Sequence, residues 1–596
     1  MIEARVYRAA FIPALLALVL AMFSFQSRPS PLPQGLAADI LFDGNEAALL
    51  AERIALEQPD RRAGRPGDAA TAELVAREFA RSGFQPDQIE RQRFTHAGRR
   101  LENVIARRAG GSRRQIVIVA ARDAGAVPDG PGSASDTAAL LELARVFQGR
   151  PSRKTLVLAS VDGSTLGEVG TERLVSELGS PDFVDAVLVV SSLGSNASEP
   201  SVLAWSNDAR RAGIGLQRTV ADSIRQELES AGGDSAGVLG QLARLAFPIG
   251  IGPQGPLLAD GYEAIRISGS GELPPPGDGP VEEIDEDRLG ALGRATLRTV
   301  TALDQGRRPE HGPESYVLVV SQVLPGWVIS LFAGALLLPV LVASVDAFAR
   351  ARRRHQDVLP WLRFVAAWVA PFLAGLALAE LLALTGATPP PPPAPVAPSE
   401  WPLDGPALAV LGGVLAGMAL ALLLARWLAA RPDARLKRPD EPGAAVAVAL
   451  TLSLGSFALW VLNPYAGLLA VPAAHLWMLA VLLRPPPSRR ARLLMVAGGL
   501  LAPLLVTVYY LFALSLDPLH GAWYLLGLVT GHSVGIATSL AGCLMLAAVC
   551  ATVEITWRVP GEEEPAPSET GPSVFGPGAY AGPGSLGGTS SALPRR

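Results

Sequence analysis

The chain has 596 residues, of which 49% are hydrophobic and 18% charged, and its formal net charge is -4 at pH 7. Its mean hydropathy of +0.30 is high for a soluble protein of this length, so we expect a membrane protein with more than one domain. The slightly acidic balance excludes the basic surface typical of nucleic-acid binding, and the two cysteines, Cys543 and Cys550, form neither a disulfide framework nor a CxxC metal pattern.

The chain starts with an apolar stretch from Ala9 to Phe25, which Arg5 and Arg8 precede. Its length fits both a membrane-spanning anchor and a cleaved signal peptide. The sequence MFSFQS at the end of the stretch is bulky and lacks the small residues of a cleavage site. We therefore expect an uncleaved anchor over residues 1–25, and either interpretation exports the polar region that follows.

Helix and strand patterns alternate in that region, residues 26–316. Residues 69–82 (AATAELVAREFARS) carry apolar side chains at helical spacing, QIVIVA at 115–120 is typical of a buried strand, and DTAALLELARVFQ at 136–148 predicts an amphipathic helix with Asp136 near its start. The strands LVLASV and DAVLVVSSLG follow, with a helix at about 168–178 between them. This alternation predicts a layered α/β domain with a mainly parallel central sheet.

The strand LVLASV ends in an acidic, glycine-rich loop, VDGSTLGEVG, and α/β enzymes often place their chemistry at such a strand end. Over roughly residues 50 to 300 the sequence resembles the M28 zinc aminopeptidase family. The resemblance is carried by ordered segments, namely RRAGRPGDAATAELVAREFARSGF, LENVIARR, QIVIVAARDAGA, GSASDTAALLELAR, KTLVLASVDGSTLGEVGT, VLVVSSLGS and GPLLADGYEAIRIS. It implies an M28-like fold for the exported domain.

The resemblance also implies where the family's two zinc ions would lie, and here the sequence departs from the pattern. The five ligand positions of the family correspond to Ala121, Asp136, Thr165, Ser192 and Gln254. The general base corresponds to Ser164, while the Asp of the family's HxD triplet is retained as Asp123. Zinc binds imidazole, thiolate or carboxylate groups, and the base must be a carboxylate, so only Asp136 could still serve as a ligand. We expect no cofactor and no zinc-dependent hydrolysis.

Two charged residues near this site, with Asp123, are candidate binding residues. Glu168 either begins the following helix, where the helix dipole favours an acidic residue, or serves as a substitute ligand or acid. For Arg122 we expect an internal ion pair with Asp123 and Asp136 that replaces the charge of the metal.

Seven further apolar stretches are long enough to cross a bilayer and define a membrane domain over residues 317–557. We place them at 320–345, 358–384, 404–428, 443–462, 464–483, 491–515 and 522–553. Lys and Arg cluster before the N-terminal span and in the loops that follow the spans at 320–345, 404–428 and 464–483, whereas the short loops PPPPPAPVAPSEWPLD, NP and LDPLHG carry none. Because short cytoplasmic loops carry the excess of Lys and Arg, this pattern places both termini in the cytoplasm and residues 26–316 outside it, in a multi-pass protein of the cell membrane.

Three polar residues, Glu380, His475 and His532, fall within the predicted spans. Such residues indicate either hydrogen bonds between helices or a path for a transported ion or proton. After the last span, residues 558–596 lack the apolar content to pack, so we expect a disordered cytoplasmic tail.

One N-terminal span, an M28-like domain and seven further spans are similar to the architecture of the Gaa-type subunit of the GPI transamidase and, more loosely, of multi-span M28 peptidases. The resemblance implies a membrane-anchored, catalytically inactive peptidase-like protein that binds a protein partner and organises a membrane complex. Two alternatives stay open. One is a hydrolase with an atypical, zinc-loaded site, and the other is a transporter or lipid-handling protein built on the seven-span bundle.

Overall fold

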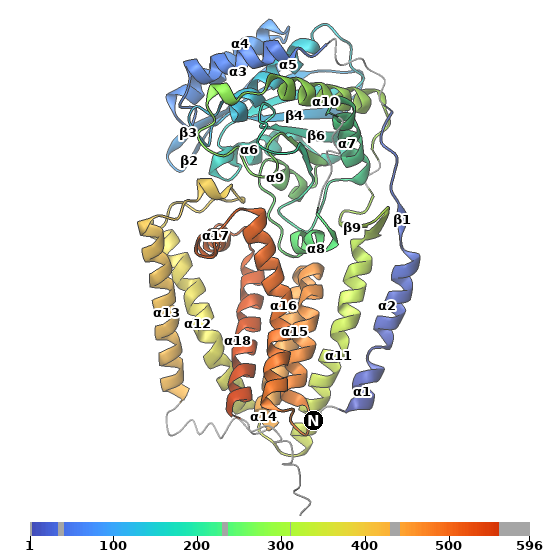
Figure 1. Cartoon of the computed structure of the whole chain (residues 1–596), viewed down its shortest axis with the longest axis vertical. Helices are drawn as coiled ribbons and strands as arrows, with labels where there is room; N and C mark the ends of the chain where they lie inside the picture. Colours follow the sequence, from blue (N-terminus) through green and yellow to red (C-terminus); the bar gives the residue numbers. More distant parts are fainter. Residues whose placement is uncertain (1–2, 34–40, 229–235, 310–311, 430–441, 559–596) are drawn as a thin grey trace, which may run out of the picture.

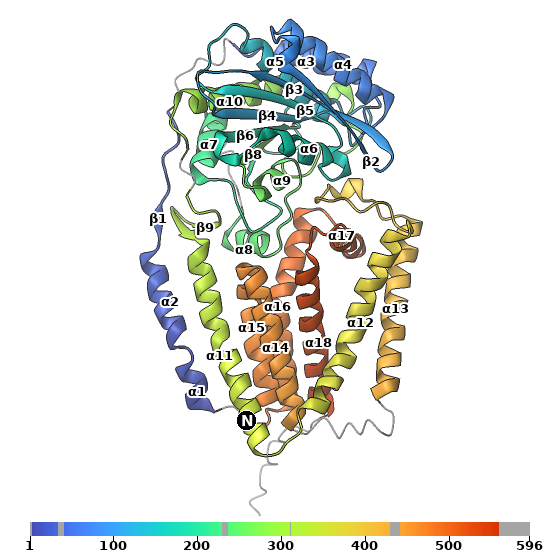
Figure 2. The same cartoon turned by 180° about the vertical axis from the view of Figure 1, so that it is seen from behind.

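A seven-stranded sheet forms the centre of the α/β domain, which stands above a bundle of long helices (Figures 1 and 2). The computed structural model describes residues 3–33, 41–228, 236–309, 312–429 and 442–558. The predicted disordered tail therefore lies outside the described residues, except for residue 558 at the end of the last helix, and so do the basic residues between 430 and 441.

The strands of this sheet pair in the order β2-β3-β5-β4-β6-β8-β7. Their bounds are β2 Ile89–His96, β3 Arg99–Arg108, β4 Gln115–Ala121, β5 Thr155–Val161, β6 Val184–Ser191, β7 Ser201–Leu203 and β8 Ala264–Ser268. Strands β5, β4, β6 and β8 are parallel, while β2, β3 and β7 join at the edges by antiparallel pairing. The expected layered α/β domain is confirmed, and its sheet is mixed, with the parallel strands in the centre.

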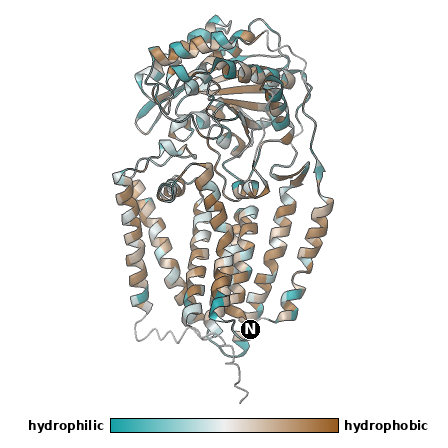
Figure 3. Ribbon diagram, in the orientation of Figure 1, coloured by the Kyte–Doolittle hydropathy of each residue, from teal (hydrophilic) through white to brown (hydrophobic). Residues whose placement is uncertain are grey.

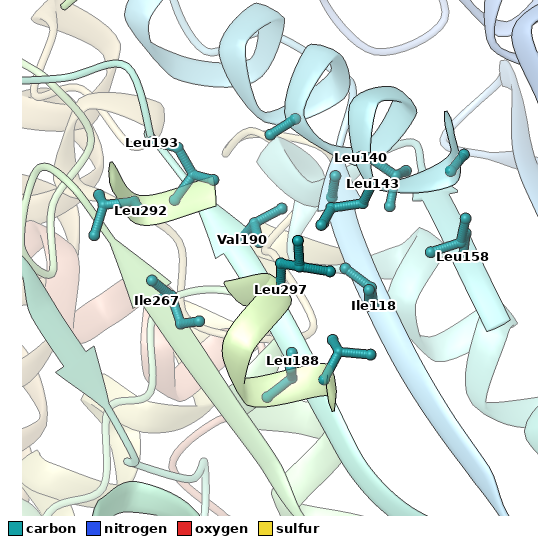
Figure 4. Close-up of a cluster of buried hydrophobic side chains, with 14 of the residues drawn as sticks. Ile118, Leu140, Leu143, Leu158, Leu188, Val190, Leu193, Ile267, Leu292 and Leu297 are labelled. Atoms are coloured by element: carbon teal, nitrogen blue, oxygen red, sulfur yellow. The ribbon is translucent and has the colours of Figure 1, made fainter. Parts of the chain in front are cut away.

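Strand β4 is apolar on both sides because helices cover both faces of the sheet. Ile116 and Ile118 face one helix layer and Val117 and Val119 the other, as the alternation of side chains along a strand requires. Figure 4 shows part of the first layer, where Leu140, Leu143 and Leu297 pack on the sheet. The first layer comprises α3 Gly44–Glu57, α4 Pro66–Arg81, α5 Ser135–Val146, α7 Ile214–Leu228 and α10 Glu286–Gln305, and the second comprises α6 Val169–Leu178 and α9 Gln254–Ala259.

Among the described residues, eight helical segments are long and apolar enough to cross a membrane, as expected, and Figure 3 shows how apolar residues run along them. The first segment comprises α1 (Ala4–Ala9) and α2 (Ile12–Phe23). The others are α11 Gly326–Arg353, α12 Leu359–Leu384, α13 Gly405–Ala429, α14 Pro442–Leu462, α15 Pro464–Leu482, α16 Arg489–Ala513 and α18 Ile536–Arg558.

The single span predicted at 522–553 is wrong, because this stretch forms two helices. A shorter helix, α17 (Pro518–Thr530), ends before residue 532, which adopts a left-handed backbone with φ of 59°, and α18 begins at Ile536. Helix α17 is held by polar contacts: Tyr524 donates to the carbonyl of Val396 (2.7 Å) and Trp523 to that of Pro402 (3.1 Å). These partners lie in the loop between α12 and α13, so the break could not be recognised from apolar content alone.

Among the described residues, the domain contacts the helical part at several places, of which three position the site. Strand β1 (Gln26–Ser27) pairs with β10 (Gln322–Pro325), which pairs with β9 (Tyr316–Val319), so the two chain connections run through one small sheet. Helix α8 (Val238–Ala246) approaches the start of α15, where Asn463 donates to the carbonyl of Leu245 (2.7 Å). The α12–α13 loop contacts the domain at a third place, described below.

Candidate functional site

A cavity of about 670 Å³ lies between the carboxyl ends of the central strands and the helical part. Seven of the residues singled out in the sequence line it, namely Ala121, Asp123, Asp136, Ser164, Thr165, Glu168 and Ser192. They meet there because the carboxyl ends of neighbouring parallel strands share one edge of a sheet. Two others do not line the cavity: Arg122 is buried beside it, and Gln254 lies at the start of α9 with 1% of its surface exposed.

Asp123 is held by Ser164 and Thr165, two of the residues singled out in the sequence. Ser164 donates its backbone N–H (3.0 Å) and its hydroxyl (2.7 Å) to Oδ1, and Thr165 donates its N–H (2.9 Å) and its hydroxyl (2.7 Å) to Oδ2. Two hydrogen bonds to each oxygen use the accepting capacity of this carboxylate. Both hydroxyl groups therefore fix the position of the Asp123 carboxylate, and neither acts as a general base.

Asp136 lies in the first turn of α5, with 4% of its surface exposed. Its carboxylate accepts the backbone N–H groups of Ser192 (2.8 Å) and Leu193 (3.0 Å). Burial raises the pKa of Asp136 to about 7, although these two hydrogen bonds favour the charged form. The Asp136 carboxyl thus ties α5 to the end of β6.

Glu168 occupies the position before α6, with a left-handed backbone (φ of 62°) and 3% of its surface exposed. The Thr171 hydroxyl donates to its Oε2 at 2.9 Å. Burial raises the pKa of Glu168 to about 8, which favours the protonated form as long as no cation lies next to the carboxyl group. It begins the helix, as one of the two interpretations had it, and also borders the cavity.

The expected ion pair of Arg122 with Asp123 and Asp136 is wrong. The Arg122 guanidinium donates to both oxygens of Asp68 on α4 (2.8 and 3.0 Å) and lies 3.5 Å from Asp162. Side chains of an extended segment alternate between its two sides, so Arg122 points away from the side that Asp123 faces. Arg122 therefore joins α4 to the sheet and does not line the cavity.

These residues do not fit a zinc site. Within the described parts of the chain, no three His, Cys, Asp or Glu side chains come together in a way that could hold a metal ion. Two acidic residues that line the cavity, Asp123 and Asp136, already accept hydrogen bonds from N–H and hydroxyl groups. The histidine that lines the cavity, His520, has its Nε2 2.9 Å from the carbonyl oxygen of Trp401.

Arg266, Glu400 and His520 also line the cavity and were not predicted from the sequence. Glu400 ends a short helical turn, Pro398–Glu400, of the α12–α13 loop and reaches Gly125 so closely that a Cβ atom there would lie 2.3 Å from its Oε1. Burial raises the pKa of Glu400 to about 7. An arginine in the otherwise apolar strand AIRIS was the one local signal in the sequence, since Glu400 and His520 come from loops far along the chain.

The three polar residues predicted inside the spans do not form one site: His475 lies apart from Glu380 and His532. His475 on α15 lies 2.6 Å from the hydroxyl of Tyr7 on α1 and 2.8 Å from the carbonyl oxygen of Leu336 on α11, so it links three helices. Glu380 on α12 lies 3.9 Å from Nδ1 of His532. His532 is not in a span but in the α17–α18 connection, which corrects its predicted place.

No protein-family model and no curated protein matches the sequence. Among solved structures, the chain is similar to an Acidobacteriales bacterium glutaminyl cyclase (19% identity, TM-score 0.37, 47% of this chain and 99% of that chain). It is also similar to BSAP, a zinc aminopeptidase from Bacillus subtilis (13%, 0.36, 45% and 99%), and to LapB from Legionella pneumophila (15%, 0.38, 49% and 81%). Likenesses of this size transfer no activity, so the function has to be argued from the chain's own residues.

Proposed function

We propose that this chain is a multi-pass membrane protein whose M28-like domain binds a ligand without hydrolysing peptides. One observation carries the proposal. Ser164 and Thr165, which the resemblance places at the positions of the family's base and zinc ligand, use their hydroxyl groups to hold Asp123. A hydroxyl group in that role neither accepts the proton of an attacking water nor binds zinc well. The cavity itself is large enough for a small-molecule ligand.

The proposal includes the sidedness of the membrane. The alternation of Lys and Arg between loops supports a cytoplasmic location for both termini and an extracytoplasmic location for residues 26–316. It divides the chain into an anchor (1–25), the domain (26–316), a membrane domain (317–557) and a tail (558–596). A single cysteine at the exposed residue Leu239 of α8, introduced into a chain lacking Cys543 and Cys550, should react with a membrane-impermeant reagent in intact cells. Protection until the cells are lysed would contradict this orientation.

A role as a binding or scaffolding subunit follows from the same reasoning, with a protein partner in a membrane complex. Mild solubilisation of native membranes and purification of the full chain should then recover a partner at constant stoichiometry. Recovery of the chain without any constant companion would contradict the scaffolding role.

The absence of peptidase chemistry is tested on the purified full chain, by measuring its zinc content and its hydrolysis of aminoacyl nitroanilides. We expect substoichiometric zinc, no hydrolysis above the buffer rate, and the same melting temperature with and without a chelator, because the residues present do not form a closed ligand set. Asp136→Asn is the control, since it replaces the retained carboxyl. Stoichiometric zinc together with hydrolysis that Asp136→Asn abolishes would overturn the proposal in favour of an atypical hydrolase.

A further inference from the structure

The two ends of the cavity differ in character. The strand-end side carries the polar groups described above, whereas Ile251, Leu273, Val396 and Leu514 form an apolar wall. These four belong to one apolar cluster that also includes residues of α12, α13, α16 and α17. Glu400 and His520 add polar groups on the side of the helical part. The cavity therefore offers a polar end within the domain and an apolar side continuous with the tops of the membrane helices.

Arg266 on β8 is a buried cation without an acidic partner in the described parts of the chain. It has 5% of its surface exposed, its Nη2 donates to the carbonyl of Glu272 (2.6 Å), and its Nε has no hydrogen-bond partner. The Glu272 carboxylate pairs with Arg244 instead. A buried guanidinium with unused N–H groups is costly unless an acceptor completes it, and Arg266 borders the cavity.

The same cavity also presents a carboxyl group, which an ammonium group of a ligand would convert to its charged form. Glu168 is almost completely buried at its wall, and its one hydrogen bond within the described residues comes from Thr171 to Oε2. Its Oε1 is thus available to a donor from a ligand. A cation site and an acidic site that face one cavity, but do not pair with each other, complement a molecule that carries both an anionic oxygen and an ammonium group.

The height of the cavity indicates where such a molecule comes from. Leu514 and Ser515, which line it, directly follow the end of α16 at Ala513. The other lining residues from the helical part are His520, near the start of α17, and residues of the loop after α12. The outer ends of membrane-spanning helices lie at the level of the lipid headgroups. An amphiphile from the bilayer could reach the cavity with its polar group while its chains stay along the apolar wall.

We propose that the cavity binds the zwitterionic headgroup of an aminophospholipid, with its phosphate at Arg266 and its ammonium at Glu168. The volume of about 670 Å³ takes the headgroup and the glycerol portion, and the acyl chains leave along Ile251, Val396 and Leu514 toward the membrane helices. This inference rests on the proposed function, since it names the ligand of the same cavity.

The test uses the full chain, delipidated in detergent, and follows its melting temperature during titration with defined lipids. A ligand that binds only the folded state raises the melting temperature. We expect phosphatidylethanolamine to raise it, and phosphatidylglycerol, which lacks the ammonium, and diacylglycerol, which lacks both charges, to bind at least about tenfold more weakly, because each lost charged hydrogen bond costs about 1.5 kcal/mol or more. Equal shifts with all three lipids would overturn the inference.

Variants locate the site. Glu168→Gln keeps the shape of the side chain and should weaken phosphatidylethanolamine binding about tenfold, and Arg266→Met should do the same. Arg266→Lys, which keeps the charge, is the second variant if Arg266→Met does not fold, and it should bind more tightly than the Met variant. Arg91→Ala on the outer surface of β2 is the matched control and should bind as the wild type does. Unchanged binding in Glu168→Gln and in the folded Arg266 variant would overturn the assignment.

Soluble competitors separate the sources of this chemistry. Free phosphoethanolamine shares the headgroup charges but has no chains, so we expect it to bind far more weakly than the lipid. Binding as tight as that of the lipid, or displacement of the lipid by a short peptide with a free N-terminus, would overturn the lipid assignment. Zinc and peptidase measurements remain independent of these titrations, so failure of the proposed function and failure of this inference can be told apart.

Discussion

Replacing Arg122 by alanine tests whether the buried ion pair, rather than a metal, holds this edge of the domain together. Arg122 is fully buried, with both oxygens of Asp68 and the carbonyl of Glu102 (2.7 Å) as partners and Asp162 close by. Removing one partner of a buried ion pair costs about 3–5 kcal/mol, because the other partner keeps its charge in a dry environment. Burial raises the pKa of Asp162 to about 8, so this carboxyl can stay protonated when Arg122 is lost. The expected loss in the free energy of unfolding is therefore at the lower end of the range, about 3 kcal/mol.

The assay is thermal unfolding of the full chain in detergent, read out by protease resistance of the domain. A loss of about 3 kcal/mol in a domain of this size lowers the melting temperature by roughly 6–12 °C. Arg91→Ala is the control: Arg91 pairs with Glu102 at a partly exposed surface (2.7 Å), and such pairs contribute less than about 1 kcal/mol. Equal melting temperatures for Arg122→Ala and Arg91→Ala would refute the reasoning.

Two further predictions concern the contacts between the domain and the helical part. Burial raises the pKa of Glu400 from 4.5 to about 7, so the folded chain binds this proton more tightly than the unfolded chain does. The stability that this proton contributes is complete below about pH 4.5 and is lost as the pH rises to 7. The wild type should therefore lose up to about 3 kcal/mol over this range relative to Glu400→Gln, measured as the difference between their melting temperatures at each pH, and parallel pH profiles would contradict this. Asn463 accepts from the N–H of Tyr465 (2.9 Å) and donates to the carbonyl of Leu245, so Asn463→Ala should cost about 2 kcal/mol. Asn463→Asp keeps the helix cap but turns a carboxylate oxygen toward the Leu245 carbonyl, so this variant should also unfold below the wild-type temperature. If the Asp variant unfolds at the wild-type temperature, the bond to Leu245 contributes nothing.

The central strands and α5 could be predicted because local pattern and tertiary environment agree there. The run QIVIVA is apolar at every position after its first, as expected of a strand with both faces covered. Asp136 lies in the first turn of an amphipathic helix. The residues that follow these strands meet at one edge of the sheet because the strands pair in parallel. The lining of the cavity by Asp123, Ser164 and Thr165 was therefore within reach of sequence reasoning.

Residues whose role depends on distant partners could not be predicted. The pairing of Arg122 with Asp68 depends on how α4 lies over the sheet, and no spacing in the sequence encodes it. Glu400 meets Gly125 only because the loop after α12 reaches the domain. The break between α17 and α18 was missed for a related reason, although the stretch TGHSVG, with two glycines, carries a turn signal that apolar content obscured.

The contact of Asn463 with α8 has a consequence for biosynthesis. Helix α8 ends at Ala246, and the Asn463 side chain, which donates to the carbonyl groups of Leu245 and Ala246, is translated long after the domain has left the ribosome. Domains generally fold as units in the order of their synthesis, so this corner of the domain must wait, incompletely hydrogen-bonded, until α15 has been inserted. The two parts can dock only after the membrane helices have been inserted. A domain expressed without these helices would not form the hydrogen bonds of Asn463 with the end of α8.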